Sequence, residues 1–190
     1  MTSGQVFTAP PRMGLLRMGL IAGALALAAP VLAHGPTPQQ AEQRIEIGAA
    51  PDAVWAILAD PATYADWHPG IAAVTMQGEG EGAKRTIEFT EGGSVVDGID
   101  RIDPENREIR WRLSREDIES FPASYYTNGI KVSPAGDGSE VTWKASFFRA
   151  DTTNEPEERF GDEAAVAAME KLMTEGLAGL KAAAEAGPPG

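Results

Sequence analysis

The sequence lacks cysteine altogether and is short of positive charge. Without cysteine, disulfide bonds, thiolate metal sites, iron–sulfur clusters and cysteine nucleophiles are all excluded. The 190 residues include 16 Lys and Arg against 28 Asp and Glu, which gives a net charge of −12 at neutral pH. Sequence-independent binding to nucleic acid needs a basic surface that displaces counterions. We therefore expect no nucleic-acid partner for this chain, whose hydrophobic share of 43% can bury the core of one small domain.

Familiar catalytic and cofactor motifs are also missing. The sequence has no Gly-x-Ser-x-Gly elbow, no Walker loop, no dinucleotide-binding glycine fingerprint and no His-Glu-x-x-His. Its two histidines are His34 and His68. The sequence therefore predicts no metal site and no cofactor. It names no catalytic residue, with His68 as the only candidate general base, because the unperturbed pKa of histidine lies near neutrality.

The first 33 residues are typical of a targeting segment. They contain Arg12 and Arg17 and no acidic residue, and an uncharged run follows from Met18 to Ala33. This run is shorter than the roughly 20 residues of a membrane-spanning helix. It ends in small residues that a signal peptidase reads, just before His34. We expect a signal peptide over 1–33, cleavage after Ala33, a periplasmic location and no membrane contact afterwards. The alternative is an uncleaved anchor.

The remaining chain divides into a flexible lead-in (34–41), one domain (42–186) and a short tail (187–190). A first strand is predicted from Glu42 to Ile47, where apolar residues alternate. Pro51 and Asp52 then open a helix, because proline fits the first helical turn and an acid favours its positive end. Pro61 ends this helix, and a second short helix precedes Pro69.

Beyond residue 70 the apolar period changes to two, which indicates strands separated by Gly- and Pro-rich turns. Short turns join strands into antiparallel hairpins. An Ala- and Glu-rich amphipathic segment follows and predicts one long helix over 155–186. The expected strands cover 71–77, 83–90, 94–102, 107–115, 124–133 and 138–149. The predicted class is α+β, a helix-grip fold in which a curved seven-stranded antiparallel sheet wraps around the long C-terminal helix, with two short helices after the first strand.

Several segments of this chain resemble the START-like, Bet v 1-type (SRPBCC, polyketide cyclase/dehydrase-like) superfamily. IEIGAAPDAVWAILAD (45–60) is similar to its first strand and helix, and YADWHPGI (64–71) to its entry into the second strand. KRTIEF (84–89), VDGIDRIDPENR (96–107) and SEVTW (139–143) are similar to the branch that contains plant abscisic-acid receptors. The same branch holds MxaD-type periplasmic accessory proteins of methanol oxidation, which the chain resembles most closely.

Strand alternation and the resemblance together point to a ligand site between sheet and helix. Alternation turns an apolar and aromatic set inward, with a few polar exceptions. Such a composition is typical of small-molecule pockets. The resemblance implies that Arg85, Asp97, Tyr126 and Asn128 line the pocket, and that the TEGG loop (90–93) occupies the receptors' gate position without their Leu-Pro element. The predicted ligand-binding residues are Arg85, Ile87, Phe89, Asp97, Ile99, Trp111, Tyr126, Asn128, Trp143, Met169 and Met173.

A purely structural interpretation of the same residues stays open. In it, Arg85 and Asp97 form an ion pair, Tyr126 and Asn128 satisfy each other, and His68 only helps to close the second helix. Three functions follow from these alternatives. The first is a non-catalytic accessory that assists contact between a methanol or alcohol dehydrogenase and its cytochrome c, with an acidic surface steering a basic partner. The second is a carrier or sensor of a small hydrophobic molecule. The third is a cyclase- or hydrolase-like enzyme using His68 or Asp97.

Overall fold

A computed structural model describes residues 1, 2, 4 and 36–187. Nearly all of the predicted signal peptide (1–33), the residue His34 after its cleavage point and most of the predicted tail (187–190) lie outside the described residues. None of the described helices is both long and apolar enough to cross a membrane. Residues 34–190 form a compact unit of their own.

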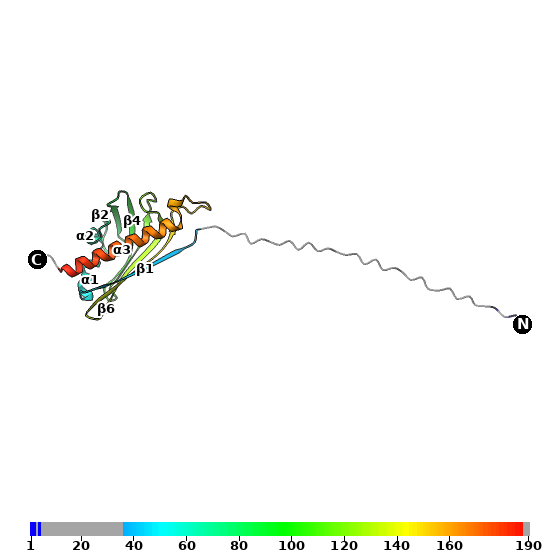
Figure 1. Cartoon of the computed structure of the whole chain (residues 1–190), viewed down its shortest axis with the longest axis horizontal. Helices are drawn as coiled ribbons and strands as arrows, with labels where there is room; N and C mark the ends of the chain where they lie inside the picture. The colour runs from blue at the N-terminus through cyan, green and yellow to red at the C-terminus, as the bar shows by residue number, and fades with distance from the viewer. Residues whose placement is uncertain (3, 5–35, 188–190) are drawn as a thin grey trace. The chain divides into compact units, whose positions relative to one another are not determined.

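Seven antiparallel strands form one sheet in the order β1-β7-β6-β5-β4-β3-β2. Every neighbouring pair except β1–β7 follows in sequence, so the sheet is a chain of hairpins whose last strand returns to the first. Figure 1 shows the long helix α3, drawn from orange to red, lying across one face of this sheet. The predicted fold class is confirmed. The strands are β1 (Gln39–Ile47), β2 (Ile71–Gln77), β3 (Lys84–Phe89), β4 (Ser94–Asp103), β5 (Glu108–Arg115), β6 (Ala123–Ala135) and β7 (Gly138–Arg149).

The helices follow the local signals in the sequence. Helix α1 (Pro51–Leu58) has proline at its start and Asp52 in its first turn. The single-turn η1 (Pro61–Thr63) is capped by Asp60, whose side chain accepts a hydrogen bond from the backbone N–H of Ala62. Two further short helices are α2 (Tyr64–Trp67) and η2 (Glu158–Phe160), and α3 spans Asp162–Ala186.

Two predicted boundaries were wrong. Strand β1 begins at Gln39, inside the predicted lead-in, because the long strand β7 continues far enough to pair Gln39 with Phe147. The final helix begins at Asp162 rather than Glu155, since Gly161 has an extended backbone and interrupts the helical path. Phe160, which the periodicity assigned to the long helix, is buried in η2 instead.

Helix α3 approaches the rest of the molecule closely at two glycines. A Cβ atom on Gly179 would lie 1.9 Å from the carbonyl oxygen of Trp67. One on Gly176 would lie 2.7 Å from His68 Cδ2 and 2.7 Å from Trp143 Cζ3. These missing side chains let α3 pack directly on the segment that ends α2 and enters β2. The helix is therefore fixed over the inner face of the sheet, where the predicted site residues lie.

Candidate functional site

Three polar side chains form a network inside the core. Arg85 Nη2 lies 3.0 Å from Asp97 Oδ2, and Tyr126 Oη donates to Asp97 Oδ1 at 2.5 Å. The strands position these groups, because Arg85 on β3 and Asp97 on β4 are directly paired in the sheet. All three residues are buried. Burial raises the pKa of Asp97, and its contacts with Arg85 and Tyr126 oppose that rise.

Aromatic rings enclose the Arg85 guanidinium. Its central carbon lies 4.5 Å from the centre of the Tyr64 ring and 5.0 Å from that of Trp111, within cation–π range. Arg85 Nε has no hydrogen-bond partner among the described residues. The cavity beside these three side chains has a volume of about 10 Å³. That is room for about one water molecule. The region between the sheet and the helices is therefore filled mainly by the protein's own side chains here.

The ion pair between Arg85 and Asp97 is present, whereas Tyr126 and Asn128 do not bond to each other. Tyr126 donates to Asp97, while Asn128 accepts a hydrogen bond from Trp143 Nε1 at 2.8 Å. The remaining predicted ligand residues lie on the inner face of the sheet, apart from two methionines on the buried side of α3. They are buried, except for the half-buried Phe89. The buried members of this group are Ile87, Ile99, Trp111, Trp143, Met169 and Met173.

His68 is held as a neutral ring. Its Nδ1 accepts from the backbone N–H of Gly70 at 3.0 Å, so Nε2 is the atom that donates to the carbonyl of Leu172 at 2.9 Å. Burial lowers the pKa of His68 to about 4. Both nitrogens are thus committed to the backbone, and a substrate proton would have to displace Gly70 to reach Nδ1. The arrangement favours a structural role that connects α2 to α3.

A larger pocket, of about 400 Å³, opens where the strands end beside α3. We call it the mouth pocket. Phe89 and Phe121 form part of its wall, with ring centres 5.7 Å apart and planes inclined by 19°. Leu172 adds apolar surface from α3, and Lys171 and Glu91 form an ion pair of 2.7 Å across it. The complete lining is His68, Pro69, Gly70, Phe89, Thr90, Glu91, Ser120, Phe121, Ala168, Lys171, Leu172 and Glu175.

The TEGG loop forms one side of the mouth pocket and packs against the loop that precedes β6. Gly93 has a φ of +79°, a conformation that favours glycine, and a Cβ there would lie 2.3 Å from Ser120 Cβ. The backbone N–H of Ser94 donates to Asp117 at 3.2 Å. The loop after β3 and the loop before β6 are therefore packed together as one wall of the pocket.

Phe121 connects the mouth pocket to the buried network. Its ring contacts Phe89 on the pocket side and meets the Tyr126 ring edge-on, with centres 6.0 Å apart. Tyr126 in turn donates to Asp97. An apolar pocket wall thus separates solvent from a cluster of polar groups lying directly behind it. The mouth pocket has polar groups of its own in Thr90, Glu91 and Lys171, and apolar surface with a few polar groups is the composition of a small-molecule site.

Sequence reasoning identified only part of this arrangement. It placed Phe89, Tyr126 and Asp97 on the inner face, but it missed Phe121 and Tyr64. Alternation sorts residues within strands, whereas Phe121 lies in a loop and Tyr64 opens a four-residue helix. The proline after Phe121 and the apolar spacing around Tyr64 were the available signals. Within the described residues, no three His, Asp or Glu side chains gather as a metal site would require.

Comparison with known proteins identifies one matching family profile and several solved structures of the same fold. The family profile described as polyketide cyclase/dehydrase and lipid transport matches residues 38–185. No curated protein sequence matches the chain significantly. The Zhui aromatase/cyclase from Streptomyces sp. R1128 is similar in structure, with a TM-score of 0.68 and 20% identity over 78% of this chain and 94% of that one.

Two other solved structures illustrate the range of this fold. The protein XoxI from Bacillus cereus has a TM-score of 0.64 and 19% identity, covering 76% of this chain and 94% of its own. Norcoclaurine synthase from Thalictrum flavum, solved with dopamine and hydroxybenzaldehyde, has a TM-score of 0.64 and 14% identity, with 95% and 100% covered. At these identities the likeness supports the shared fold and carries no assignment of activity.

Proposed function

The chain belongs to the polyketide cyclase/dehydrase and lipid transport family, and we propose that it is an exported, non-catalytic protein that binds a small, largely apolar molecule in the mouth pocket. The main support is the pocket itself, whose volume of about 400 Å³ lies in the range of small-molecule sites. Phe89, Phe121 and Leu172 supply the apolar surface. Thr90 and the Lys171–Glu91 pair supply polar groups at the rim.

Binding without catalysis fits the chemistry of the titratable groups that line this pocket or lie buried behind it. A general base must reach the proton that it removes. His68 uses both ring nitrogens in hydrogen bonds to the backbone, and the Asp97 carboxylate is engaged by Arg85 and Tyr126. A carrier or sensor needs only an apolar wall and a few orienting groups. The wall formed by Phe89 and Phe121 supplies this directly.

A fluorescence titration with uncharged N-phenyl-1-naphthylamine tests the proposal on residues 34–190, which form a compact unit. We expect saturable binding, weakened at least fivefold in Phe121→Ala, because that change removes one face of the aromatic wall. Phe148→Ala is the matched control, since Phe148 belongs to the opposite, outer face of the sheet. Circular dichroism spectra would verify that both variants fold.

Equal loss of dye binding in both phenylalanine variants would overturn the assignment of the mouth pocket. Absence of saturable binding in the wild-type protein would do the same. Mass spectrometry of the protein purified from its native compartment is a second experiment, which identifies any natural ligand that stays bound. A compound recovered from wild type and lost in Phe121→Ala would support the proposal.

A second candidate function is the accessory role in methanol or alcohol oxidation, which the MxaD-type resemblance implies. The observation that favours it is an exposed acidic surface around the start of α3, formed by Glu155, Glu157, Glu158 and Glu163. Such a surface would steer a basic partner, for example a cytochrome c, at low ionic strength. Arg159 is the one basic residue between positions 155 and 163. Its charge is neutralised by ion pairs with Glu119 and Glu157.

Calorimetric titration with a purified basic cytochrome c tests this second function. We expect binding in 20 mM salt that weakens at least tenfold in the double variant Glu158→Lys/Glu163→Lys. The control is Glu105→Lys, which reverses an exposed charge in the turn between β4 and β5. Unchanged affinity in the double variant, or unchanged methanol-dependent respiration after deletion of the gene, would contradict the accessory role.

A further inference from the structure

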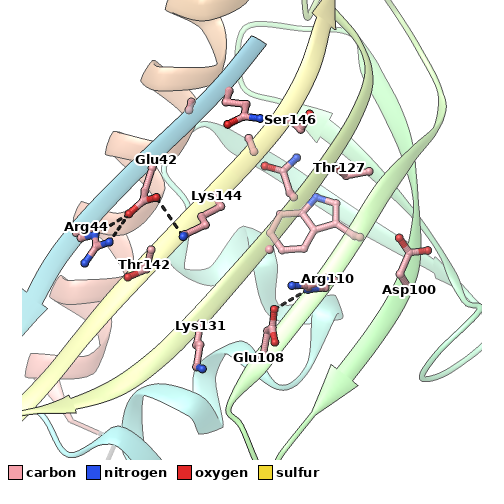
Figure 2. A pocket seen from close by; sticks show the side chains of 16 residues that line it. Glu42, Arg44, Asp100, Glu108, Arg110, Thr127, Lys131, Thr142, Lys144 and Ser146 are labelled. Carbon is pink, nitrogen blue, oxygen red and sulfur yellow. Dashed lines mark hydrogen bonds and ion pairs between the residues drawn. The ribbon is translucent and has the colours of Figure 1, made fainter. Parts of the chain in front are cut away.

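The outer face of the sheet, opposite α3, carries a groove of about 840 Å³ that the proposed function does not use. In Figure 2, α3 lies behind β1 and β7, and the labelled side chains project from the strands toward the viewer. Strand pairing arranges them in rows. One row runs Glu42, Lys144, Gly129 and Arg110 across β1, β7, β6 and β5. The glycine leaves a gap in this row, between a lysine and an arginine.

No contact among the described residues requires glycine at position 129. Its φ is not positive, and an added Cβ would come no closer than 3.4 Å, to the flexible Arg110 side chain. The ladder is regular there, since Thr127 to Lys131 pair without interruption with both β5 and β7. Gly98, by contrast, lies between two register shifts of β4, and glycine in a strand often accompanies a bulge. Glycine inside a regular strand often marks the close approach of a ligand.

Three cationic side chains surround this gap. Lys144 and Arg110 flank Gly129 on the neighbouring strands, and Lys131 lies two residues along β6 on the same face. Carboxylates also line the groove. Glu42 lies 3.2 Å from Lys144 Nζ, and Glu108 lies 2.5 Å from Arg110 Nε. Asp100 lies at its edge and is paired with Arg112. These pairs leave donors available. Among the described residues, Lys131 makes no ion pair and the two terminal nitrogens of Arg110 make no hydrogen bond, as Figure 2 also illustrates.

Hydroxyl groups complete the surroundings of the gap. Thr127 and Ser146 are paired in the row on one side of Gly129, and Thr142 pairs with Lys131 in the row on the other side. All of these residues line the groove. A guanidinium fork binds carboxylate or phosphate with two parallel hydrogen bonds. Lysine ammonium groups add charge, and hydroxyls add neutral donors and acceptors, so the chemistry of the groove matches an anion that also carries hydroxyl groups.

We propose that this groove is a second binding site, for a small anion with two or more carboxylate or phosphate groups, seated over Gly129 between Arg110, Lys131 and Lys144. The site is independent of the mouth pocket, because it uses the opposite face of the sheet. Its occupant is small and highly charged rather than apolar. The gap at Gly129 lets an anionic group lie against the strand backbone and reach all three cations.

Isothermal titration of residues 34–190 with citrate and, separately, with pyrophosphate tests this site. We expect saturable one-to-one binding of at least one of them in 20 mM salt. Affinity should fall at least tenfold in Gly129→Thr, which fills the gap with a residue that strands favour. It should fall at least fivefold in Lys144→Ala. Lys181→Ala is the control, because Lys181 lies on α3 and is bonded to Glu185 and to the carbonyl of Glu46.

Thermal unfolding of Gly129→Thr separates loss of binding from loss of fold. We expect a melting temperature equal to or above that of the wild type, with anion binding lost. Binding of citrate alone would assign the site to carboxylates, and binding of pyrophosphate alone to phosphates. No saturable binding of either anion up to 10 mM would overturn the proposal. So would an equal loss of affinity in Lys181→Ala and Lys144→Ala, because that result indicates only the general ionic atmosphere.

Discussion

Asp97 and Arg85 form a buried ion pair, so each charge depends on the other for its stabilisation. Removing one partner of a buried pair leaves an uncompensated charge and costs about 3–5 kcal/mol. We expect Asp97→Ala to lower the free energy of unfolding by about this amount, as measured by urea denaturation. The cost is large because Arg85 Nε already has no hydrogen-bond partner among the described residues.

The double variant Asp97→Leu/Arg85→Met provides the matched comparison. Replacing both members of a buried pair with apolar residues is often neutral or stabilising. We therefore expect the double variant to be clearly more stable than Asp97→Ala alone. If it is equally unstable, the cost comes from the altered packing or from Tyr126 losing its acceptor.

The lowered pKa of His68 predicts a loss of folding stability in mild acid. Because burial lowers its pKa to about 4 while the unfolded side chain titrates near 6.5, the unfolded chain binds a proton first as pH falls. Stability from this group is therefore complete above the unfolded pKa and declines between about pH 6.5 and 4. We expect a loss of about 2 kcal/mol between pH 7 and pH 5, measured by urea denaturation at each pH.

His68→Gln isolates that contribution, because glutamine keeps one donor and one acceptor but does not titrate. Its free energy of unfolding is expected to be lower at pH 7, since the ring is lost from the aromatic core. The decline from pH 7 to pH 5 should be smaller than in the wild type by about 2 kcal/mol. An identical slope in both proteins would show that other groups cause the decline.

At the scale of the elements, the close approach of α3 to Trp67 makes a specific prediction about helix glycines. Gly→Ala in an exposed helix normally stabilises by up to about 1 kcal/mol. At Gly179 the new Cβ would overlap the Trp67 carbonyl oxygen. We expect Gly179→Ala to destabilise by more than about 2 kcal/mol in urea denaturation, reversing the usual sign. Thr174→Ala, at an exposed position of the same helix, should instead stabilise slightly.

The elements were predictable where a local pattern exists. Alternation located the strands and correctly sorted Arg85, Asp97 and Tyr126 to the inner face, because one side of each strand is buried. It missed the strand residues from Gln39 to Ala41, which become strand only because β7 extends beside them. The start of α3 was predicted too early, because the Glu-rich segment before Gly161 has the composition of a helix although its backbone is not α-helical.

The site was predictable to a lesser degree for the same physical reason. Parity can assign a residue to a face, but it cannot say which of several inward groups will bond. It therefore left Tyr126 free to pair with Asn128, whereas Trp143 supplies the closer donor for Asn128. The mouth pocket is formed partly by loops, whose sequences have no hydrophobic periodicity. The position of Phe121 therefore could not be predicted from the sequence.

For the whole molecule, the net charge of −12 predicts that neutral salt stabilises the fold. Acids outnumber bases, so excess carboxylates repel one another across the surface, and salt screens that repulsion. We expect the melting temperature to rise by a few degrees between 20 mM and 500 mM NaCl. The double variant Glu79→Lys/Glu155→Lys, at exposed positions, should show a smaller rise. A falling melting temperature would mean that surface ion pairs outweigh the repulsion.

The pairing of β1 with β7 also has a consequence for the order of events during synthesis. The first strand to leave the ribosome pairs with the last, and its neighbour on the other side of the core is α3. Such distant contacts form slowly. A growing chain therefore carries an unpaired, partly apolar strand for most of its synthesis. The sheet and the helix that covers it therefore become complete only after the final third of the chain, which carries β7 and α3, has emerged.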